Sequence, residues 1–322
     1  LEETFVIDGI EVDVRASIGV ASTEDGDDAA TLLRQADVAM YVAKRSRSGI
    51  EKYSKVHDLF SAERLELASE VRRAIEQREL VVYYQPKIDL RTGRADGVEA
   101  LVRWQHPTRG LLGPAEFLPV VESTHLIKPL TLYVLDESLR QAREWSDGGD
   151  HIRMAVNLAA AYAGDPRLPT QVAELLARHD IAPDQLEIEL TETAVLDDPT
   201  RAKNVLEALS LLGVRLSVDD FGTGYASIAY LTGLPITTLK IDQSFILDLA
   251  APGNLAVTRY SIELARTLGL TTIAEGVEDE ANLRILEDLG CDEAQGFFFA
   301  RPTPPEDCIA WIRARNRTEV AG

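Results

Sequence analysis

The sequence predicts an α/β fold in which a mainly parallel sheet closes into a barrel, and three observations lead to this prediction. Short apolar strands alternate with segments of helical periodicity downstream of residue 90, a pattern typical of βαβ units. Most of these strands end in a carboxylate, an amide or a lysine, as strands that lead to a barrel active site do. Because the polar ends are spread over many strands, a barrel is favoured over a doubly wound sheet, which would gather them at one switch point.

Composition limits the classes of function. The chain has 322 residues, 45% of them hydrophobic and 27% charged, which suits one large globular domain or two smaller ones. Its net charge of −20 argues against binding to duplex nucleic acid, which needs a basic surface. A small phosphorylated ligand remains compatible with this charge, provided that metal ions and a few local cations neutralise it.

The two cysteines, Cys291 and Cys308, are too few for a disulfide framework and fit a reducing compartment. No apolar run is long enough to span a bilayer, and no signal peptide is recognisable. The chain begins within a strand pattern, so we expect it to be a piece of a longer protein. We expect a cytoplasmic location, or the cytoplasmic side of a membrane-anchored parent protein.

Residues 4–21 are expected to form two strands joined by a hairpin turn at Asp8-Gly9. Asp27 or Asp28 then caps a helix with an apolar face. One hairpin and one helix are too small to close a core of their own. Residues 17–21 and 32–44 resemble the C-terminal end of a GGDEF (diguanylate cyclase) domain. The catalytic signature of that family lies upstream of this end and is absent, so we expect a small α+β remnant (hairpin plus helix) without cyclase activity.

The remaining elements follow in order along the chain. Residues 80–88 are expected to form a strand in which Gln85 is held extended by Pro86. The next strand, at 96–104, carries Glu99 and Arg103, a pair that in isolation would also fit a surface salt bridge worth ~0.5 kcal/mol. Helices are expected at residues 58–77, 114–123, 130–145, 170–179, 199–212, 254–268 and 279–289, with Asp198 as a start signal and Gly213, Gly269 and Gly290 as stop signals.

A short strand ending at Val218 leads into two adjacent carboxylates, Asp219 and Asp220, and then into a loop that contains Gly222 and Gly224. Neighbouring carboxylates repel each other, and a hard divalent cation with oxygen ligands would hold both in the ionised form. A solvated turn would explain the same residues in isolation. Polar side chains also end the other strands, however, and we therefore expect a shared site at the rim of the barrel: Glu99, Asn157, Glu189, Lys240, Glu275 and Gln295.

From about residue 60 to residue 313 the chain resembles an EAL domain, the cyclic di-GMP phosphodiesterase family. The resemblance rests on Glu99-Ala100-Leu101 with Arg103, and on further motifs in the order of the family at residues 84–86, 157–158, 189–192, 219–225, 239–242, 274–278 and 295–297. It implies a modified TIM (βα)8 barrel, hydrolysis of cyclic di-GMP to linear 5'-pGpG, and two ions of Mg²⁺ or Mn²⁺, with Ca²⁺ as an inhibitor. The domains would then be a GGDEF-like fragment at 1–55, a linker helix at 56–66, the barrel at 67–316 and a tail at 317–322.

The resemblance also implies a role for each matching residue. One ion would be held by Glu99, Asn157, Glu189 and Asp219, and the other by Asp219, Asp220 and Glu275. Lys240 would orient or help to deprotonate the attacking water and would stabilise developing charge, beside the catalytic carboxylates Glu99, Asp219 and Asp220. Arg103 would clamp a phosphate, and Gln85 and Gln295 would fix the substrate. The residues expected to support a loop and its dimer contact are Glu192, Phe221, Gly222, Thr223, Gly224, Tyr225 and Glu278.

Other functions would explain part of the same sequence pattern. A non-catalytic cyclic di-GMP receptor is the alternative, although such proteins usually lack a ligand or the lysine, and this chain retains all of them. A barrel hydrolase for another phosphodiester would carry a similar ligand set. Asp220-Phe221-Gly222 also occurs in protein kinases, but no glycine-rich strand loop with a partnered lysine precedes it here. The expected partners are cyclic di-GMP, a second copy of the barrel in a homodimer, and upstream sensory or GGDEF domains, with no duplex nucleic acid.

Overall fold

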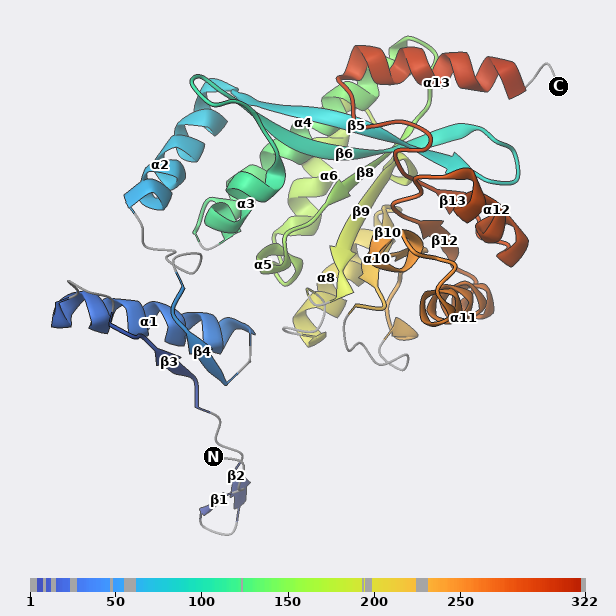
Figure 1. Cartoon of the computed structure of the whole chain (residues 1–322). Helices are drawn as coiled ribbons and strands as arrows, with labels where there is room; N and C mark the ends of the chain where they lie inside the picture. The colour runs from blue at the N-terminus through green and yellow to red at the C-terminus, as the bar shows by residue number, and fades with distance from the viewer. Residues whose placement is uncertain are drawn as a thin grey trace. The chain divides into compact units, whose positions relative to one another are not determined.

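The computed structural model describes residues 5–7, 10–12, 16–23, 28–46, 49–54, 62–122, 124–192, 194, 199–223 and 231–319. The chain divides into two compact units, Leu1–Val71 and Arg72–Gly322. The first unit carries β1 to β4 and α1, and the second carries the large sheet with its helices (Figure 1). None of the helices among these residues combines the length and the apolar composition that a bilayer-spanning helix needs.

The N-terminal unit contains the expected hairpin and helix and one further pairing. β1 (Phe5–Ile7) pairs antiparallel with β2 (Ile10–Val12), while the turn residues Asp8 and Gly9 lie outside the described residues. The strand expected to continue to residue 21 is instead interrupted. β3 (Ile18–Val20) pairs in parallel with β4 (Ile50–Lys52), and α1 (Ala29–Ser46) connects these two strands.

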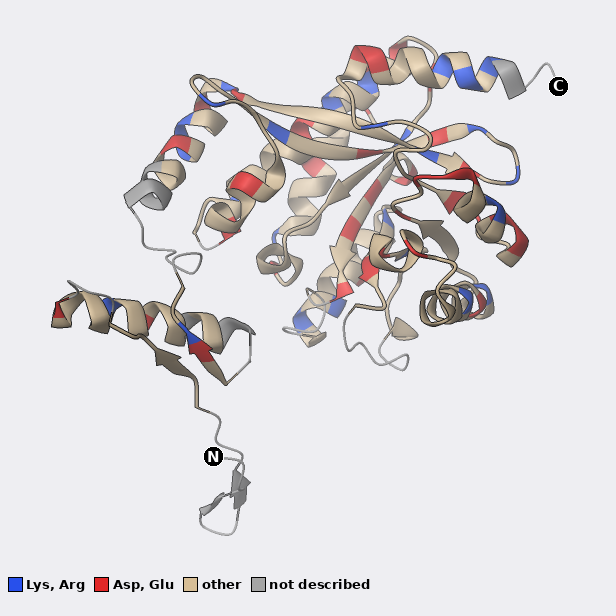
Figure 2. Ribbon diagram, in the orientation of Figure 1, with Lys and Arg blue, Asp and Glu red and all other residues tan. Residues whose placement is uncertain are grey.

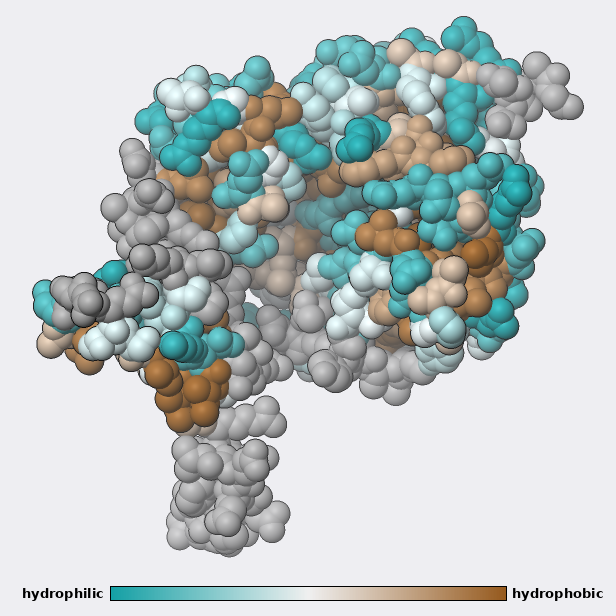
Figure 3. All heavy atoms as spheres, viewed as in Figure 1, coloured by the Kyte–Doolittle hydropathy of each residue, from teal (hydrophilic) through white to brown (hydrophobic). Residues whose placement is uncertain are grey.

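The helix α1 begins after a side-chain cap, because the backbone N–H of Thr31 donates a hydrogen bond of 2.7 Å to Asp28 Oδ1. Gly19 of β3 lies so close to α1 that a Cβ atom there would come within 1.9 Å of the Ala36 carbonyl oxygen. The opposite side of β3 and β4 stays uncovered. Ile18, Val20 and Ile50 are exposed, and apolar surface is visible over these strands in Figure 3.

Within the described residues of the second unit, eight strands close into a barrel. In spatial order they are β5 (Leu80–Asp89), β13 (Glu293–Ala294), β12 (Thr271–Ala274), β11 (Thr238–Ile241), β10 (Arg215–Phe221), β9 (Leu186–Thr191), β8 (Arg153–Asn157) and β6 (Ala95–His106). The pairing of β5 with β6 completes the ring, and β7 (Gly110–Leu112) adds to the other side of β6. The prediction of a modified (βα)8 barrel is confirmed.

The modification lies in β5, which runs antiparallel to both of its neighbours, β6 and β13. The other neighbouring pairs in the ring, from β6 through β8 to β13, are parallel. The reversed strand places Gln85 directly opposite Glu99. A residue near the start of the larger unit is thereby brought to the end of the barrel where the parallel strands finish.

The seven helices predicted from the sequence are present to within a few residues, and the structure adds helices at residues 160–163, 243–246 and 305–319 that were not predicted. Their bounds are α2 (Ala62–Gln77), α3 (Pro114–Glu122), α4 (Ile127–Asp147), α5 (Ala160–Ala163), α6 (Leu168–His179), α8 (Pro199–Leu211), α10 (Gln243–Ile246), α11 (Pro252–Leu268), α12 (Glu280–Leu289) and α13 (Pro305–Glu319), with a short 3-10 helix η2 (Pro183–Gln185). Gly269 and Gly290 end α11 and α12 in the left-handed conformation, as the stop signals predicted. The start signal Asp198 lies outside the described residues.

The space between the strands and the surrounding helices is filled with apolar side chains. Leu135 and Leu139 of α4 are buried, and the rings of Tyr84 and Trp145 meet edge-to-face at 5.0 Å between centroids.

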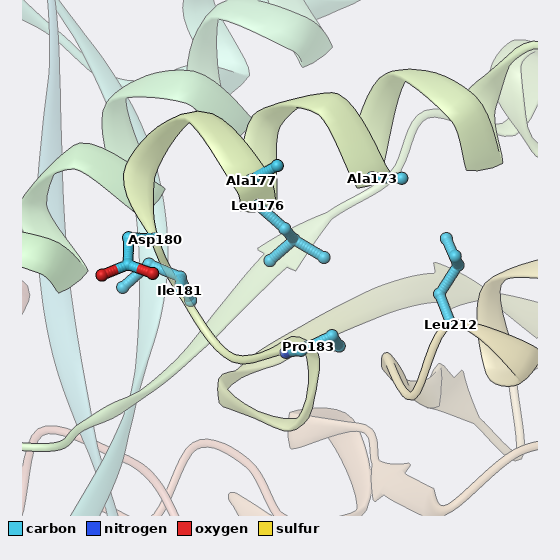
Figure 4. A pocket seen from close by; sticks show the side chains of 7 residues that line it. All are labelled: Ala173, Leu176, Ala177, Asp180, Ile181, Pro183 and Leu212. Atoms are coloured by element: carbon cyan, nitrogen blue, oxygen red, sulfur yellow. The ribbon is translucent and has the colours of Figure 1, made fainter.

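A pocket of about 280 Å³ lies between α6, η2 and the turn after α8 (Figure 4). Because Pro183 and Leu212 precede β9 and β10, this pocket lies at the end of the barrel where the strands begin.

Candidate active site

Lys240 lies at the centre of the polar strand ends. Its side chain is fully buried, and its Nζ atom is 2.7 Å from Glu189 Oε2, 3.0 Å from Asp219 Oδ2 and 2.7 Å from Glu275 Oε1. These carboxylates come from β9, from β10 and from the residue that follows β12. Consecutive parallel strands end side by side, so residues far apart in the sequence meet around one ammonium group.

The charge on Lys240 is fixed by its surroundings. Burial by itself disfavours the charged form, but the carboxylates of Glu189, Glu275 and Glu99 outweigh burial and raise the pKa of Lys240 well above its ordinary value. In the metal-free protein these carboxylates therefore hold Lys240 as a cation. It can donate hydrogen bonds and stabilise negative charge, and it is a poor proton acceptor.

Three carboxylates beside Lys240 form the densest acidic cluster among the described residues. Asp219, Asp220 and Glu275 each place one oxygen within 4.8 Å of the others. Asp220 adopts a left-handed backbone conformation with a φ of 55°, and its N–H donates a 2.9 Å hydrogen bond to Asp219 Oδ1. The tight backbone turn at the end of β10 lets two consecutive side chains point into the same site, where successive strand residues would otherwise face opposite sides.

This cluster holds more negative charge than Lys240 balances. Burial, with the nearby carboxylates of Asp219 and Asp242, raises the pKa of Asp220 to about 6. Burial also raises the pKa of Glu275 to about 8, with Asp219 and Glu99 adding to the effect against the attraction of Lys240. A divalent cation would relieve this repulsion. The donor set consists of oxygen atoms, with no histidine or cysteine, and it fits Mg²⁺ or Mn²⁺.

A second group of side chains surrounds Glu99. Asn157 Nδ2 donates a 2.6 Å hydrogen bond to Glu99 Oε1, and Gln295 Nε2 donates one of 2.6 Å to Glu99 Oε2. Gln295 Nε2 also reaches Gln85 Oε1 at 2.9 Å, and Gln85 Nε2 donates to the Ala300 carbonyl oxygen at 3.0 Å. Burial raises the pKa of Glu99. The sequence-predicted residues of β5, β6, β8 and β13 thus form one connected network.

Gln295 has a polar atom left over in this network. Its Oε1 atom is buried and has no hydrogen-bond partner within the described part of the chain. A buried acceptor without a donor is uncommon in folded proteins, so this amide oxygen is a candidate for contact with a bound molecule.

Glu189 joins the two groups and reveals a residue that the sequence analysis missed. Its Oε1 atom is 2.6 Å from Lys87 Nζ, and its Oε2 atom is 2.7 Å from Lys240 Nζ. Burial opposes ionisation, but the two lysines lower the pKa of Glu189 to about 2. Lys87 also lies 3.6 Å from Glu187. One sequence feature could have identified Lys87: it is a lysine within an apolar strand, and because it lies two residues after Gln85 it shares the same face of β5.

Arg103 occupies a more open position. The parallel pairing of β6 with β8 ends at Ala100, and Arg103 lies three residues further along β6, towards the rim. Its guanidinium lies 5.8 Å from the centre of the Tyr83 ring, and Nη1 donates a 2.9 Å hydrogen bond to the Val102 carbonyl oxygen. Among the described residues it makes no ion pair. It is half-buried, and that burial lowers its pKa.

The loop after β10 starts at the buried end of that strand. Phe221 is buried, and the N–H of Gly222 lies 3.4 Å from Glu192 Oε2. Gly222 has a φ of 101°, and a Cβ atom there would meet the Phe245 ring at 2.8 Å. Thr223 Oγ1 donates a 2.9 Å hydrogen bond to the Asp220 carbonyl oxygen.

Three further residues were predicted to support this loop and its dimer contact: Gly224, Tyr225 and Glu278. Gly224 and Tyr225 lie outside the described residues. Glu278 is exposed between β12 and α12 and has no ion pair within the described ranges. Its expected part in the loop and the dimer contact stays a prediction.

Two families match this chain. The EAL domain matches residues 68–302, and the family described as the diguanylate cyclase GGDEF domain matches residues 1–49. The first match spans the whole barrel with its strand-end residues, and the second covers β1, β2, β3 and α1 of the N-terminal unit.

Named relatives cover nearly all of this chain. The bifunctional diguanylate cyclase/cyclic di-GMP phosphodiesterase MucR of Pseudomonas aeruginosa is 42% identical over 316 residues, which are 97% of this chain and 46% of that protein. The cyclic di-GMP phosphodiesterase PdeR of Escherichia coli is 37% identical over 312 residues, which are 96% of this chain and 47% of that protein. The chain therefore spans less than half of the length of each of these relatives.

Solved structures resemble most of this chain. The PaMucR phosphodiesterase in complex with c-di-GMP is 44% identical, with a TM-score of 0.73 over 76% of this chain and 99% of that one. The EAL enzyme Bd1971 in its form with bound cAMP and cyclic di-GMP is 27% identical, with a TM-score of 0.76 over 89% of this chain and 77% of that one.

Proposed function

The chain belongs to the EAL domain family, and from this premise we propose that its barrel is a metal-dependent phosphodiesterase that hydrolyses cyclic di-GMP to linear 5'-pGpG. The observation that carries the proposal is the buried Lys240, held by three carboxylates next to an all-oxygen cluster. A phosphodiester is anionic and resists attack by water. A site with a fixed cation and a surplus of metal-binding oxygens supplies what that reaction needs.

We propose that two Mg²⁺ or Mn²⁺ ions belong to the working site, with Ca²⁺ as an inhibitor. Asp219, Asp220 and Glu275 would hold one ion. The ligands of the other would be Glu99, Asn157, Glu189 and Asp219. Bound ions would neutralise the phosphodiester and lower the pKa of a coordinated water towards neutrality.

The protein's own groups divide the remaining work. Lys240 donates hydrogen bonds from a fixed ammonium, which orients the attacking oxygen and stabilises the negative charge that develops on the phosphate. Arg103 binds phosphate oxygens in pairs from its place near the rim. Gln85 and Gln295 hold each other and Glu99, and Gln295 Oε1, which has no hydrogen-bond partner among the described residues, would accept a hydrogen bond from the substrate.

The wider organisation is also part of the proposal. We assign residues 67–316 to the catalytic domain, 56–66 to a linker, 317–322 to a tail and 1–55 to a GGDEF-like fragment without cyclase activity. The barrel would form a homodimer supported by the loop that begins at Phe221. Upstream sensory domains would regulate it, in the cytoplasm or at the cytoplasmic side of a membrane.

One assay tests the activity. The purified chain is incubated with cyclic di-GMP and Mg²⁺, Mn²⁺ or Ca²⁺, and products are separated by chromatography. We expect pGpG with Mg²⁺ or Mn²⁺ and none with Ca²⁺, because the looser coordination of Ca²⁺ spoils a close metal pair. Tight binding of cyclic di-GMP without product at saturating Mg²⁺ and Mn²⁺ would show a receptor instead. Faster cleavage of another phosphodiester in a substrate panel would overturn the choice of substrate.

A further inference from the structure

Lys87 is a buried cation that the proposed reaction does not use directly. Its side chain is 2% exposed, and the carboxylates of Glu187 and Glu189 with which it pairs are 2% and 0% exposed. A lysine inside a barrel loses its hydration, and its presence has to be explained by the groups that it contacts. The nearer of these is a proposed metal ligand, and the geometry points to a positioning role.

We propose that Lys87 is a positioning residue for the metal site, which holds Glu189 Oε1 inside the barrel so that Glu189 Oε2 is presented at the rim. The inference rests on the proposed function in one respect, namely that Glu189 is a metal ligand. Lys87 itself touches neither the substrate nor the metal.

The strand register supports this direction of action. On the reversed strand β5, Gln85 lies opposite Glu99, whereas Lys87 lies opposite Gly97, which is two residues nearer to the start of β6. Gly97 in turn pairs with Arg153, the first residue of β8. Lys87 therefore lies deeper in the barrel than the network around Glu99. It contacts Glu189 from the side away from the rim.

The two oxygens of Glu189 are consequently not equivalent. Oε1 is 2.6 Å from Lys87 Nζ, in the barrel interior. Oε2 is 2.7 Å from Lys240 Nζ, which also contacts Asp219 and Glu275. A carboxylate fixed at both oxygens has one orientation. Without Lys87, the side chain of Glu189 would be free to turn both oxygens towards Lys240 or to rotate away from the rim.

Glu187 provides the matched control. It lies two residues before Glu189 on β9, on the same face of the strand, and its Oε1 atom is 3.6 Å from Lys87 Nζ. It has no place in the proposed catalytic or metal-binding machinery. If Lys87 only neutralised Glu187, removal of both charges together would restore what the loss of Lys87 alone takes away.

The test measures Mn²⁺ binding by titration calorimetry for four proteins: the unchanged chain, Lys87→Met, Glu187→Gln and the double variant. Unfolding midpoints of the metal-free proteins are measured alongside. We expect Lys87→Met to weaken Mn²⁺ binding by about 10-fold to 100-fold, the usual effect of losing a group that orients a ligand. Glu187→Gln should leave Mn²⁺ binding and turnover near those of the unchanged chain.

The double variant decides between the two roles. We expect it to recover thermal stability relative to Lys87→Met while Mn²⁺ binding stays weak, because Glu189 still lacks its inner partner. Recovery of Mn²⁺ binding in the double variant would overturn the proposal, as would Mn²⁺ binding by a folded Lys87→Met protein that equals that of the unchanged chain. Calorimetry measures Mn²⁺ binding without turnover. A chain that binds Mn²⁺ but does not cleave cyclic di-GMP would therefore refute the proposed function, while Mn²⁺ binding by the four proteins would still decide whether Lys87 positions Glu189.

Kinetics at saturating Mn²⁺ give a second readout. Because Lys87 lies below the site, its loss should lower kcat and leave KM for cyclic di-GMP within about twofold. A rise in KM with unchanged kcat would mean that Lys87 acts on substrate binding, and it would overturn the positioning role.

Discussion

The two ends of the barrel interior both carry buried charges, but they balance them differently. At the rim, Lys240 stands against Glu99, Glu189, Asp219, Asp220 and Glu275. At the end where the strands begin, Arg153 pairs with Glu293 at 2.6 Å, and Arg215 and Lys87 approach Glu187 at 3.9 and 3.6 Å. Along β9, which runs from the inner end to the rim, acidic residues alternate with uncharged ones (Figure 2). The inner charges are paired within the protein, while the rim has more carboxylates than Lys240 balances.

This difference separates structural from functional charge. Buried ion pairs that satisfy each other contribute little to stability beyond the cost of burial, but breaking one leaves an uncompensated charge. A surplus of one sign in a buried site destabilises the metal-free protein, and it is typical of sites that bind an ion of the other sign. We therefore expect substitutions at the rim to affect activity most, and substitutions at the inner end to affect stability.

The largest effect is expected for Lys240→Met. The methionine side chain retains the volume but removes the cation from the three carboxylates, so kcat should fall by about 10³-fold or more. Steady-state turnover of cyclic di-GMP with Mg²⁺ measures this, with circular dichroism as a control for folding. A well-folded Lys240→Met protein that keeps a tenth of the activity would show that the reaction at the rim does not need the positive charge of Lys240.

The second effect concerns pH. Raised carboxyl pKa values mean that the metal-free folded protein holds protons that the unfolded chain has released, so its stability falls as pH rises from about 4 through 6 to 8. Metal ions must displace those protons. Their apparent affinity should therefore rise with pH, by roughly tenfold per unit for one displaced proton, and level off above the raised pKa values.

Titration calorimetry with Mn²⁺ between pH 5 and 8 measures this slope, and Asp220→Asn is the matched variant. That variant loses one ligand and also one titrating group, so its binding should be weaker and less dependent on pH. An equal slope in both proteins would contradict the assignment of the raised pKa to Asp220. The lowered pKa of Glu189 lies below this window and contributes nothing to it.

Much of the rim could be predicted from the sequence, because parallel strands bring their C-terminal ends together wherever those strands lie in the chain. Asp219, Glu275 and Lys240 each follow or end a short apolar run, and a local pattern is enough to place them. Lys87 could not be found in this way, since it lies inside a strand that runs in the opposite direction. The reversal of β5 is set by its pairing with β6 and β13, which no local pattern encodes.

The inner charges were missed for a related reason. Arg153, Arg215 and Glu293 stand at strand starts, where a charged residue ordinarily faces water. The pairing of Arg153 with Glu293 depends on ring closure, which brings the starts of β8 and β13 to the same end of the barrel. Arg215 instead approaches Glu187 on the neighbouring strand β9. The loop beyond Thr223 was predicted from its motif alone, and its central residues lie outside the described part of the structure.

A smaller effect on activity is expected for Gly222→Ala. The substitution places a side chain at a φ of 101° and 2.8 Å from the Phe245 ring, and the strain of about 1–3 kcal/mol would shift Asp220, two residues earlier in the chain. Activity should fall by about tenfold. Gly269→Ala is the control, since Gly269 has a φ of 72° with no atom near the added Cβ. It should cost about 1 kcal/mol of stability without loss of kcat. If Gly222→Ala and Gly269→Ala had the same kcat, the geometry of the loop after β10 would not matter for catalysis.

The smallest effect on activity is expected at the inner end, for Glu293→Gln. The change removes the charge that pairs with Arg153, whose side chain is 25% exposed, so water compensates part of the loss and the cost should be about 1–3 kcal/mol. Denaturant unfolding measures this, and kcat should stay within about twofold. Glu293 Oε2 has no hydrogen-bond partner within the described ranges, and the same holds there for Glu187 Oε1 and Arg215 Nε. A folded Glu293→Gln protein with strongly reduced kcat would mean that charge at the inner end affects catalysis at the rim, and the division between structural and functional ends would then fail.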